Sequence, residues 1–323
     1  MKDAEGIATS VIALIVVLAV VAGAGIYLLV TGTGGTSQGG VGENEPTGTP
    51  GENGAGDNKP PSTPEVPTSG PYLDKIYSAT SSNGINWVVD NTMVFNHASV
   101  PGAVYFENKL YVYFVNAADW ENEKLSVGIS TDRGATFTTH DVQISGSNSP
   151  YPVDPNPIVQ DNKIRLTYLG NFNQGETGKI VTANSTDGIN FTEDGVIFTA
   201  DVYDPDLFYD EVGGEWVLLL NTGGLTKATA SSPTATFTED TSFNWSEGSI
   251  SSTHKIEDKY YTYYAGTAAG AGGVCVAEYS NGALTNVANR ILNYQGLNAD
   301  PTVAIFGTND YKMYFKTRAV QQG

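Results

Sequence analysis

Three aspartates in this chain stand directly in front of a proline, in the segments VDPNP, YDPDL and ADPTV. They are Asp154, Asp204 and Asp300. Proline restricts the residue before it to extended backbone and fits at the first residue of a strand, so each aspartate is expected at a strand entrance. Carboxylates that converge on one cleft repel one another, which shifts their pKa values and suits acid–base chemistry. A simple turn, in which Asp bonds to nearby backbone donors, is the alternative for each copy.

The elements that position these aspartates repeat about every fifty residues. One repeated feature is a polar turn before an aromatic residue, seen in SSNGINW, STDRGATF, STDGINF and SSPTATF, with a degenerate copy in YSNGALT. The other is a pair of apolar runs around a short turn, with pairs that begin near residues 102, 156, 206, 252 and 301. Gly and Asn suit hairpin turns, and β-branched and aromatic residues suit strands. No segment beyond residue 72 has helical periodicity.

The two features alternate along the chain, which begins with a hairpin and ends with a strand pair. This pattern predicts an all-β, five-bladed β-propeller in which the hairpin at 73–95 completes the blade begun by the pair at 301–315. A β-sandwich would have turns every 8–12 residues, which does not fit the long repeat. Inner strands surround the axis of a propeller, so Asp154, Asp204 and Asp300 are predicted to face one central funnel.

The segment YDPDLFYDEVGGEWVLLL resembles the third-blade segment of family 43 glycoside hydrolases, the arabinanase and xylosidase group. The resemblance implies a five-bladed propeller that hydrolyses glycosides with inversion or only binds them, and in which Asp204 orients the general acid. It also implies a fourth-blade Glu as the general acid, for which Glu247 is the candidate, and a first-blade Asp as the general base. The first inner strand, NHASVPGAVYF, contains no Asp. Asp154 is the candidate replacement, because inversion needs two carboxyls in opposite protonation states.

Other side chains near the strand entrances are candidates for contacts with a sugar: Asp206, Asp300, His97, Trp120 and Tyr203. Aromatic rings can stack on pyranose faces, although most aromatic residues of a propeller pack between blades. Asp154 could equally accept hydrogen bonds from sugar hydroxyls. No Cys and His cluster has zinc-binding spacing, and no cofactor is expected. Ca²⁺ suits an acidic funnel chemically, yet no loop has calcium-binding spacing.

The N-terminal part has a different composition from the rest of the chain. Residues 7–30 are uncharged and long enough to cross a bilayer as a helix. A cleaved signal peptide, with AGA at 22–24 as its cleavage site, is the alternative. The apolar run continues to Val30, which favours a retained signal anchor. The start, MKDAEGIATSVIALIVV, resembles the signal segments of archaeal pilin-like proteins. Residues 31–71 are rich in Gly, Pro and Thr and are predicted to be a disordered linker.

These boundaries divide the chain into an anchor at 1–30, a linker at 31–71 and a propeller at 72–323. The net charge of −19 argues against a nucleic-acid partner, because phosphate binding needs Lys and Arg. Three sequons would permit N-glycosylation outside the cell, at Asn184, Asn190 and Asn244. We therefore expect a single-pass membrane protein with an extracellular propeller and a carbohydrate partner. It is either a tethered glycosidase-like propeller acting on polysaccharide or a non-catalytic binding or adhesion module.

Overall fold

The computed structural model describes residues 67–147, 151–172, 177–267, 273–292 and 294–319, and two very short strands near the N-terminus. These strands, β1 (Val21–Ala22) and β2 (Gly25–Ile26), pair in antiparallel fashion. The remainder of the predicted membrane anchor and the linker up to residue 66 lie outside the described residues. In the described part of the chain, no helix is long and apolar enough to cross a membrane.

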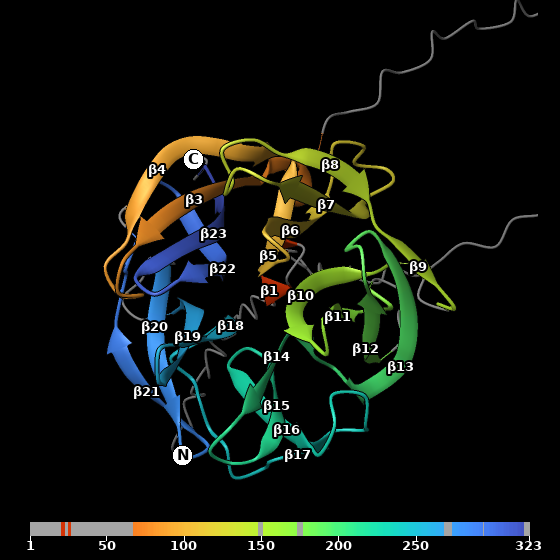
Figure 1. The fold of residues 1–323 in the computed structure, drawn as a ribbon, viewed down its shortest axis with the longest axis vertical. Coiled ribbons are helices and arrows are strands. Elements are labelled where there is room, and N and C mark those ends of the chain that lie inside the picture. Colours follow the sequence, from red (N-terminus) through yellow and green to blue (C-terminus); the bar gives the residue numbers. More distant parts are fainter. Residues whose placement is uncertain are drawn as a thin grey trace, which may run out of the picture.

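Antiparallel blades surround a central axis (Figure 1). From the axis outward, the first blade contains β5 (Ala98–Phe106), β6 (Lys109–Asn116), β7 (Lys124–Ser130) and β8 (Thr138–Asp141). The second contains β10 (Val153–Gln160), β11 (Lys163–Leu169), β12 (Gly178–Ser185) and β13 (Asn190–Ala200), with β9 (Gln143–Ser145) parallel to its outer strand. The third contains β14 (Tyr203–Asp210), β15 (Glu215–Asn221), β16 (Leu225–Ala230) and β17 (Thr238–Glu239). The fourth contains β18 (Gly248–Ile256), β19 (Lys259–Gly266), β20 (Gly273–Ser280) and β21 (Ala283–Ala288).

The fifth blade joins the two ends of the propeller. Its strand order is β22 (Leu297–Gly307), β23 (Asp310–Arg318), β3 (Lys75–Ser81) and β4 (Val88–Asn96). The N-terminal hairpin therefore completes the C-terminal blade, which confirms the predicted five-bladed ring and its closure. The one helical element among the described residues is a short 3-10 turn, η1 (Pro71–Leu73), directly before β3.

Apolar clusters fill the wedges between neighbouring blades. Tyr113 of the first blade meets Phe191 of the second edge to face, with ring centroids 5.9 Å apart. Trp87 of the fifth blade meets Tyr263 of the fourth in the same way at 5.8 Å. Burying one large apolar side chain stabilises a fold by about 1.5–3 kcal/mol. The aromatic residues that follow the polar turns therefore hold adjacent blades together.

Two of the polar turns between third and outer strands, at 130–137 and 185–191, share one hydrogen-bond pattern. In STDRGATF, Ser130 Oγ accepts from the N–H of Gly134 at 2.8 Å, and Asp132 Oδ1 accepts from the N–H of Thr136 at 2.9 Å. The turn at 185–191 repeats this arrangement. Hydrogen bonds from the Thr136 side chain and its neighbours hold the pKa of Asp132 below its usual range. The hairpins predicted at these turns thus form through local side-chain-to-backbone bonds.

Candidate functional site

The same backbone irregularity occurs near the start of every inner strand. The residues with this conformation, one per blade, have φ between 48° and 57°: Val100, Asp154, Asp204, Ile250 and Asp300. Pairing with the second strand shifts register at each of these points. A positive φ is strained for side chains other than glycine, and it marks a β-bulge that re-aims the residue. The sequence predicted extended backbone before each proline, and the bulge overrides that preference.

The five bulges surround one small cavity on the axis, and Asp154, Asp204 and Asp300 all contribute to its wall. These aspartates are only 3%, 4% and 3% exposed. The cavity volume is about 30 Å³, which has room for a water molecule and not for a pyranose. Val100 and Ile250 occupy the equivalent positions in the first and fourth blades. The structure thus brings the three predicted carboxyls together, in a much narrower space than the expected funnel.

Hydrogen bonds and one ion pair satisfy one carboxylate oxygen of each of the three aspartates. Asp154 Oδ2 accepts from the N–H of Asp204 at 3.3 Å, and Asp204 Oδ2 accepts from Asn221 Nδ2 at 2.8 Å. Asp300 Oδ2 lies 2.5 Å from Lys316 Nζ, in a pair whose two side chains are nearly buried. Among the described residues, the Oδ1 atom of each aspartate has no hydrogen-bond partner. The cluster therefore contains one internal cation and three unsatisfied acceptors.

Burial is the largest cause of the pKa shifts of the three aspartates. It raises the pKa of Asp154 to about 7, and the neighbouring Asp300 carboxylate adds to this shift. Burial, with the charges of Asp154 and Asp300, raises the pKa of Asp204 well above its usual range. Burial also raises the pKa of Asp300, and Lys316 opposes that shift. Although burial disfavours the Lys316 ammonium, Asp300 and Asp74 raise its pKa. At neutral pH the cluster keeps protons, because like charges in a buried space cannot all ionise.

Asp206 has a different role from the other aspartates of its segment. It is fully buried and accepts from the N–H of Thr253 at 2.8 Å, from Thr253 Oγ1 at 2.7 Å and from Ser251 Oγ at 2.8 Å. Burial raises its pKa to about 6, against these hydrogen bonds. Its acceptors are used within the protein, so the sugar contact expected from the sequence is not available here. Asp206 instead joins the third blade to the fourth.

The remaining predicted residues do not line the axial cavity. Glu247 is exposed and lies three residues before Ile250, the residue that the structure places at the fourth-blade bulge. Trp120, in the connection between β6 and β7, is 36% exposed. Tyr203 is half-buried against the cluster between the second and third blades, and burial raises its pKa. His97 lies in a separate cleft at the edge of the closing blade.

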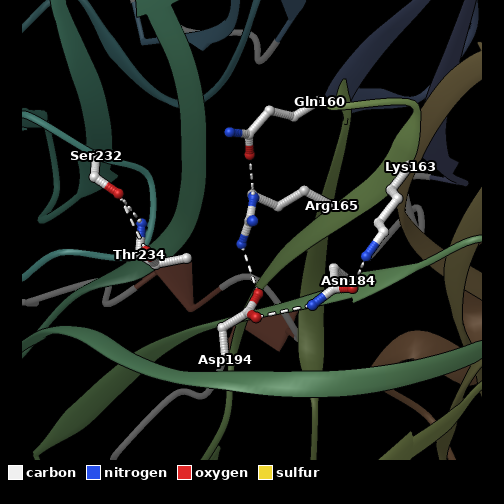
Figure 2. A network of polar contacts seen from close by, with 7 residues as sticks. All are labelled: Gln160, Lys163, Arg165, Asn184, Asp194, Ser232 and Thr234. Carbon is white, nitrogen blue, oxygen red and sulfur yellow. Dashed lines mark hydrogen bonds and ion pairs between the residues drawn. The ribbon is translucent and has the colours of Figure 1, made fainter.

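The three sequons lie in different environments. The amide nitrogen of Asn184 donates to Asp194 Oδ1 at 2.8 Å, beside the Arg165–Asp194 ion pair, and its oxygen accepts from Lys163 (Figure 2). Asn190 is exposed, but its amide nitrogen donates to Asp187. Asn244 is exposed, with no side-chain hydrogen bond among the described residues. Because a glycan attaches at the amide nitrogen, Asn244 is the sequon that a glycan would disturb least.

Several residues of the site carried weak signals in the sequence. Lys316 follows the buried Tyr314 by two positions in YKMYFKTR, so both share one side of the strand. A charge on a buried strand face is a signal for an internal ion pair. Val100 stands before Pro101, as the aspartates stand before their prolines, whereas Ile250 precedes no proline and is found only by alignment around the ring. Within the described residues, no three His, Cys, Asp or Glu side chains are arranged to hold a metal ion.

Comparison with solved structures shows that glycoside hydrolases share this propeller fold. No family model matches the sequence, and no curated protein matches it. A thermostable family 43 glycoside hydrolase has 12% identity and a TM-score of 0.55, with 70% of this chain and 89% of that chain covered. An α-L-arabinofuranosidase from Clostridium thermocellum has 16% identity and a TM-score of 0.50, over 67% and 80%. A family 117 glycoside hydrolase from the marine bacterium Zobellia galactanivorans has 12% identity and a TM-score of 0.50, over 77% and 91%. At these identities the likeness shows the fold, and it supports the propeller that the third-blade segment implied.

Proposed function

We propose that this chain is a carbohydrate-binding β-propeller displayed at a cell surface, built on the fold of glycoside hydrolases without their hydrolytic carboxyl pair. The observation that carries this proposal is the identity of two bulge residues. The resemblance to family 43 calls for a base in the first blade and an acid in the fourth. Val100 and Ile250 occupy those bulges, and neither can transfer a proton.

The enclosure of the three aspartates supports the same conclusion. A catalytic carboxyl must come within about 2.6–3.2 Å of the proton that it transfers. Asp154, Asp204 and Asp300 surround a cavity of about 30 Å³ and are almost fully buried. A pyranose is too large for that space, so the proposed sugar contacts lie elsewhere on the propeller. Lys316 balances part of the charge of the aspartates and acts as a built-in counter-ion.

A glycosidase-like activity on polysaccharide is the second candidate, and one specific observation favours it. Glycosidases pair a carboxyl of raised pKa with an ionised one. Here burial raises the pKa of Asp154 to about 7 and that of Asp204 well above its usual range, while Lys316 favours the ionised form of Asp300. Carboxyls of raised pKa and a carboxyl paired with a cation therefore face one cavity. Catalysis would require the axis to open enough to admit the glycosidic bond.

A panel of arabinan, xylan and mannan oligosaccharides separates these functions when cleavage and binding are both measured. Binding without cleavage supports the binding module. Cleavage that Asp204→Asn reduces by roughly 10²–10⁴-fold selects the glycosidase, because that is the scale of a lost acid–base group. Asp161→Asn is the matched control, since Asp161 is an exposed turn residue. If no oligosaccharide is bound or cleaved, both proposals fail.

Display outside the cell completes the proposed function. The uncharged segment at 7–30, the Gly- and Pro-rich linker and the exposed sequon at Asn244 support a single-pass protein with its propeller outside. Protease added to intact cells is expected to cut the linker and release the propeller. An intracellular protein measured in parallel serves as the control for cell integrity. Full protection of the propeller on intact cells would contradict this topology.

A further inference from the structure

A second and much larger cleft lies at one edge of the closing blade. Its volume is about 840 Å³, and η1, the ends of β3, β4 and β23, and the segment at 294–296 form its walls. Strand register shows which face of the propeller this is: Leu297 at the start of β22 pairs with Arg318, Thr317 pairs with Lys75, and Lys75 pairs with Asn96. The cleft therefore opens on the face where the inner strands begin.

Aromatic rings line this cleft in two pairs. Tyr72 stacks on His97, with centroids 4.0 Å apart and an interplanar angle of 21°. His97 Nδ1 donates to the carbonyl of Tyr72 at 2.5 Å, which fixes the orientation of the imidazole. Tyr77 and Tyr294 lie 4.8 Å apart, and Tyr294 also packs on Phe315. All four cleft rings are half-buried, so packing holds each ring in place and leaves part of it at the surface.

The cleft also carries a free positive charge. Lys75 is exposed at its wall and has no hydrogen bond or ion pair among the described residues. Arg318 lies at the same wall, but its charge is paired, because Nε donates to Asp74 Oδ1 and Nη2 donates to the Gly70 carbonyl. The buried Asp74 carboxylate balances the charge of Arg318, so Lys75 is the unpaired cation among the described residues of the cleft. The Lys75 ammonium is therefore the group of this cleft that can pair with an anionic ligand.

We propose that this cleft binds a pyranose that carries an anionic group, either a carboxylate or a sulfate, within a longer polysaccharide. The Lys75 ammonium pairs with the anionic group, and the rings of Tyr72 and Tyr294 contact the apolar face of the sugar. Rigid aromatic rings beside a charged donor suit a ligand with one apolar face and one charged edge. This inference rests on the proposed carbohydrate-binding function and assigns it a site away from the axial aspartates.

Binding measurements on the full chain in detergent test the charge requirement. The probes are an oligogalacturonate, a sulfated galactan oligosaccharide and a neutral galactan oligosaccharide of the same length. Lys75→Gln should weaken binding of the anionic probe by about fivefold, the upper scale of a partly exposed ion pair. It should also reduce the salt dependence of binding. Lys109→Gln is the matched control, because Lys109 is exposed and has no partner among the described residues. It pairs with Phe106 at the end of the inner strand β5, on the propeller face opposite the cleft.

The rings are tested separately from the charge. Tyr294→Ala should weaken binding of the anionic probe by roughly tenfold, the scale of one lost aromatic contact. Tyr294→Phe keeps the ring and should retain most of the affinity. Melting curves of both variants show whether the fold persists. If Tyr294→Ala unfolds the protein, the salt dependence of Lys75→Gln decides the result.

The outcomes separate this inference from the proposed function. Stronger binding of an anionic probe than of the neutral probe, lost in Lys75→Gln and kept in Lys109→Gln, supports the inference, and the preferred probe identifies carboxylate or sulfate. Oligosaccharide binding that Lys75→Gln and Tyr294→Ala both leave unchanged overturns the inference but leaves the binding function standing. Equal affinity for charged and neutral probes overturns the proposal that the sugar ligand is anionic. No binding of any oligosaccharide overturns both.

Discussion

The Nε atom of Arg318 donates to Oδ1 of Asp74 at 2.6 Å, and this contact joins the last strand of the propeller to the residue just before β3. Asp74 also accepts from Ser99 Oγ at 2.8 Å through its side chain and from the N–H of Ala98 at 3.1 Å through its carbonyl. One buried residue thus bonds to both blades that meet where the ring closes. Charge-assisted hydrogen bonds of this kind are stronger than neutral ones.

Arg318→Met should lower the free energy of unfolding by about 3–5 kcal/mol, because it leaves the buried Asp74 carboxylate unpaired. Lys124→Met is the matched control, since the Lys124–Asp141 pair is about half exposed on both sides. Lys124→Met should lower the free energy of unfolding by less than about 1 kcal/mol. Urea denaturation of both variants measures the difference. Equal losses of unfolding free energy in the two variants would show that the Arg318–Asp74 contact contributes little to stability.

Removing residues 1–66 should leave a cooperatively folding propeller, because every described contact of the ring lies beyond that point. Removing residues 1–96 deletes β3 and β4, opens the fifth blade and exposes the edge of β23. Unpaired strand edges promote aggregation. Size-exclusion chromatography and thermal melting compare the two fragments. A monomeric, cooperatively melting product from the larger deletion would refute the closure mechanism.

Asp154 should make stability depend on pH near neutrality. Burial raises its pKa to about 7 in the folded state, and the ordinary value near 3.8 applies to the unfolded chain. Between these values the folded state binds the extra proton, so the free energy of unfolding falls as pH rises through this window. Asp154→Asn should flatten that slope, with an upper bound of about 4 kcal/mol across the window. Urea titrations at several pH values measure the slope, which Asp161→Asn should leave intact. An unchanged slope in Asp154→Asn would mean that the carboxyl titrates normally.

Lys316 should contribute most to the stability of the fold when Asp300 is ionised. Lys316→Met leaves the buried Asp300 without its cation, and breaking such a pair costs about 3–5 kcal/mol at neutral pH. At lower pH Asp300 takes up a proton, so the loss should shrink. Adding Asp300→Asn to Lys316→Met should recover much of the stability, because no unpaired charge remains. A double-mutant cycle by urea denaturation at pH 5 and pH 7.5 tests this, and additive effects of the two substitutions would disprove the coupling.

Much of the fold could be predicted from local patterns. Turn residues such as Ser130 and Asp132 bond within their own segment, so the turn pattern repeats wherever the sequence repeats. Alternating hairpins and strand pairs then indicated the blades and the closing role of residues 73–95. The shared position of Asp154, Asp204 and Asp300 followed from the same repeat, because each aspartate stands at an equivalent point of its blade.

Sequence alone therefore determined the all-β repeat, the closure of the ring and the alignment of the three aspartates. Only the tertiary structure decided how deeply these carboxyls are buried, that Lys316 pairs with Asp300 and that Asp206 is used between blades. It also assembled the aromatic cleft from Tyr72, His97 and Tyr294, which are far apart in the chain. The physical reason is that strand and turn preferences act over a few neighbouring residues. Burial, pKa and accessibility depend on side chains that other blades bring into contact.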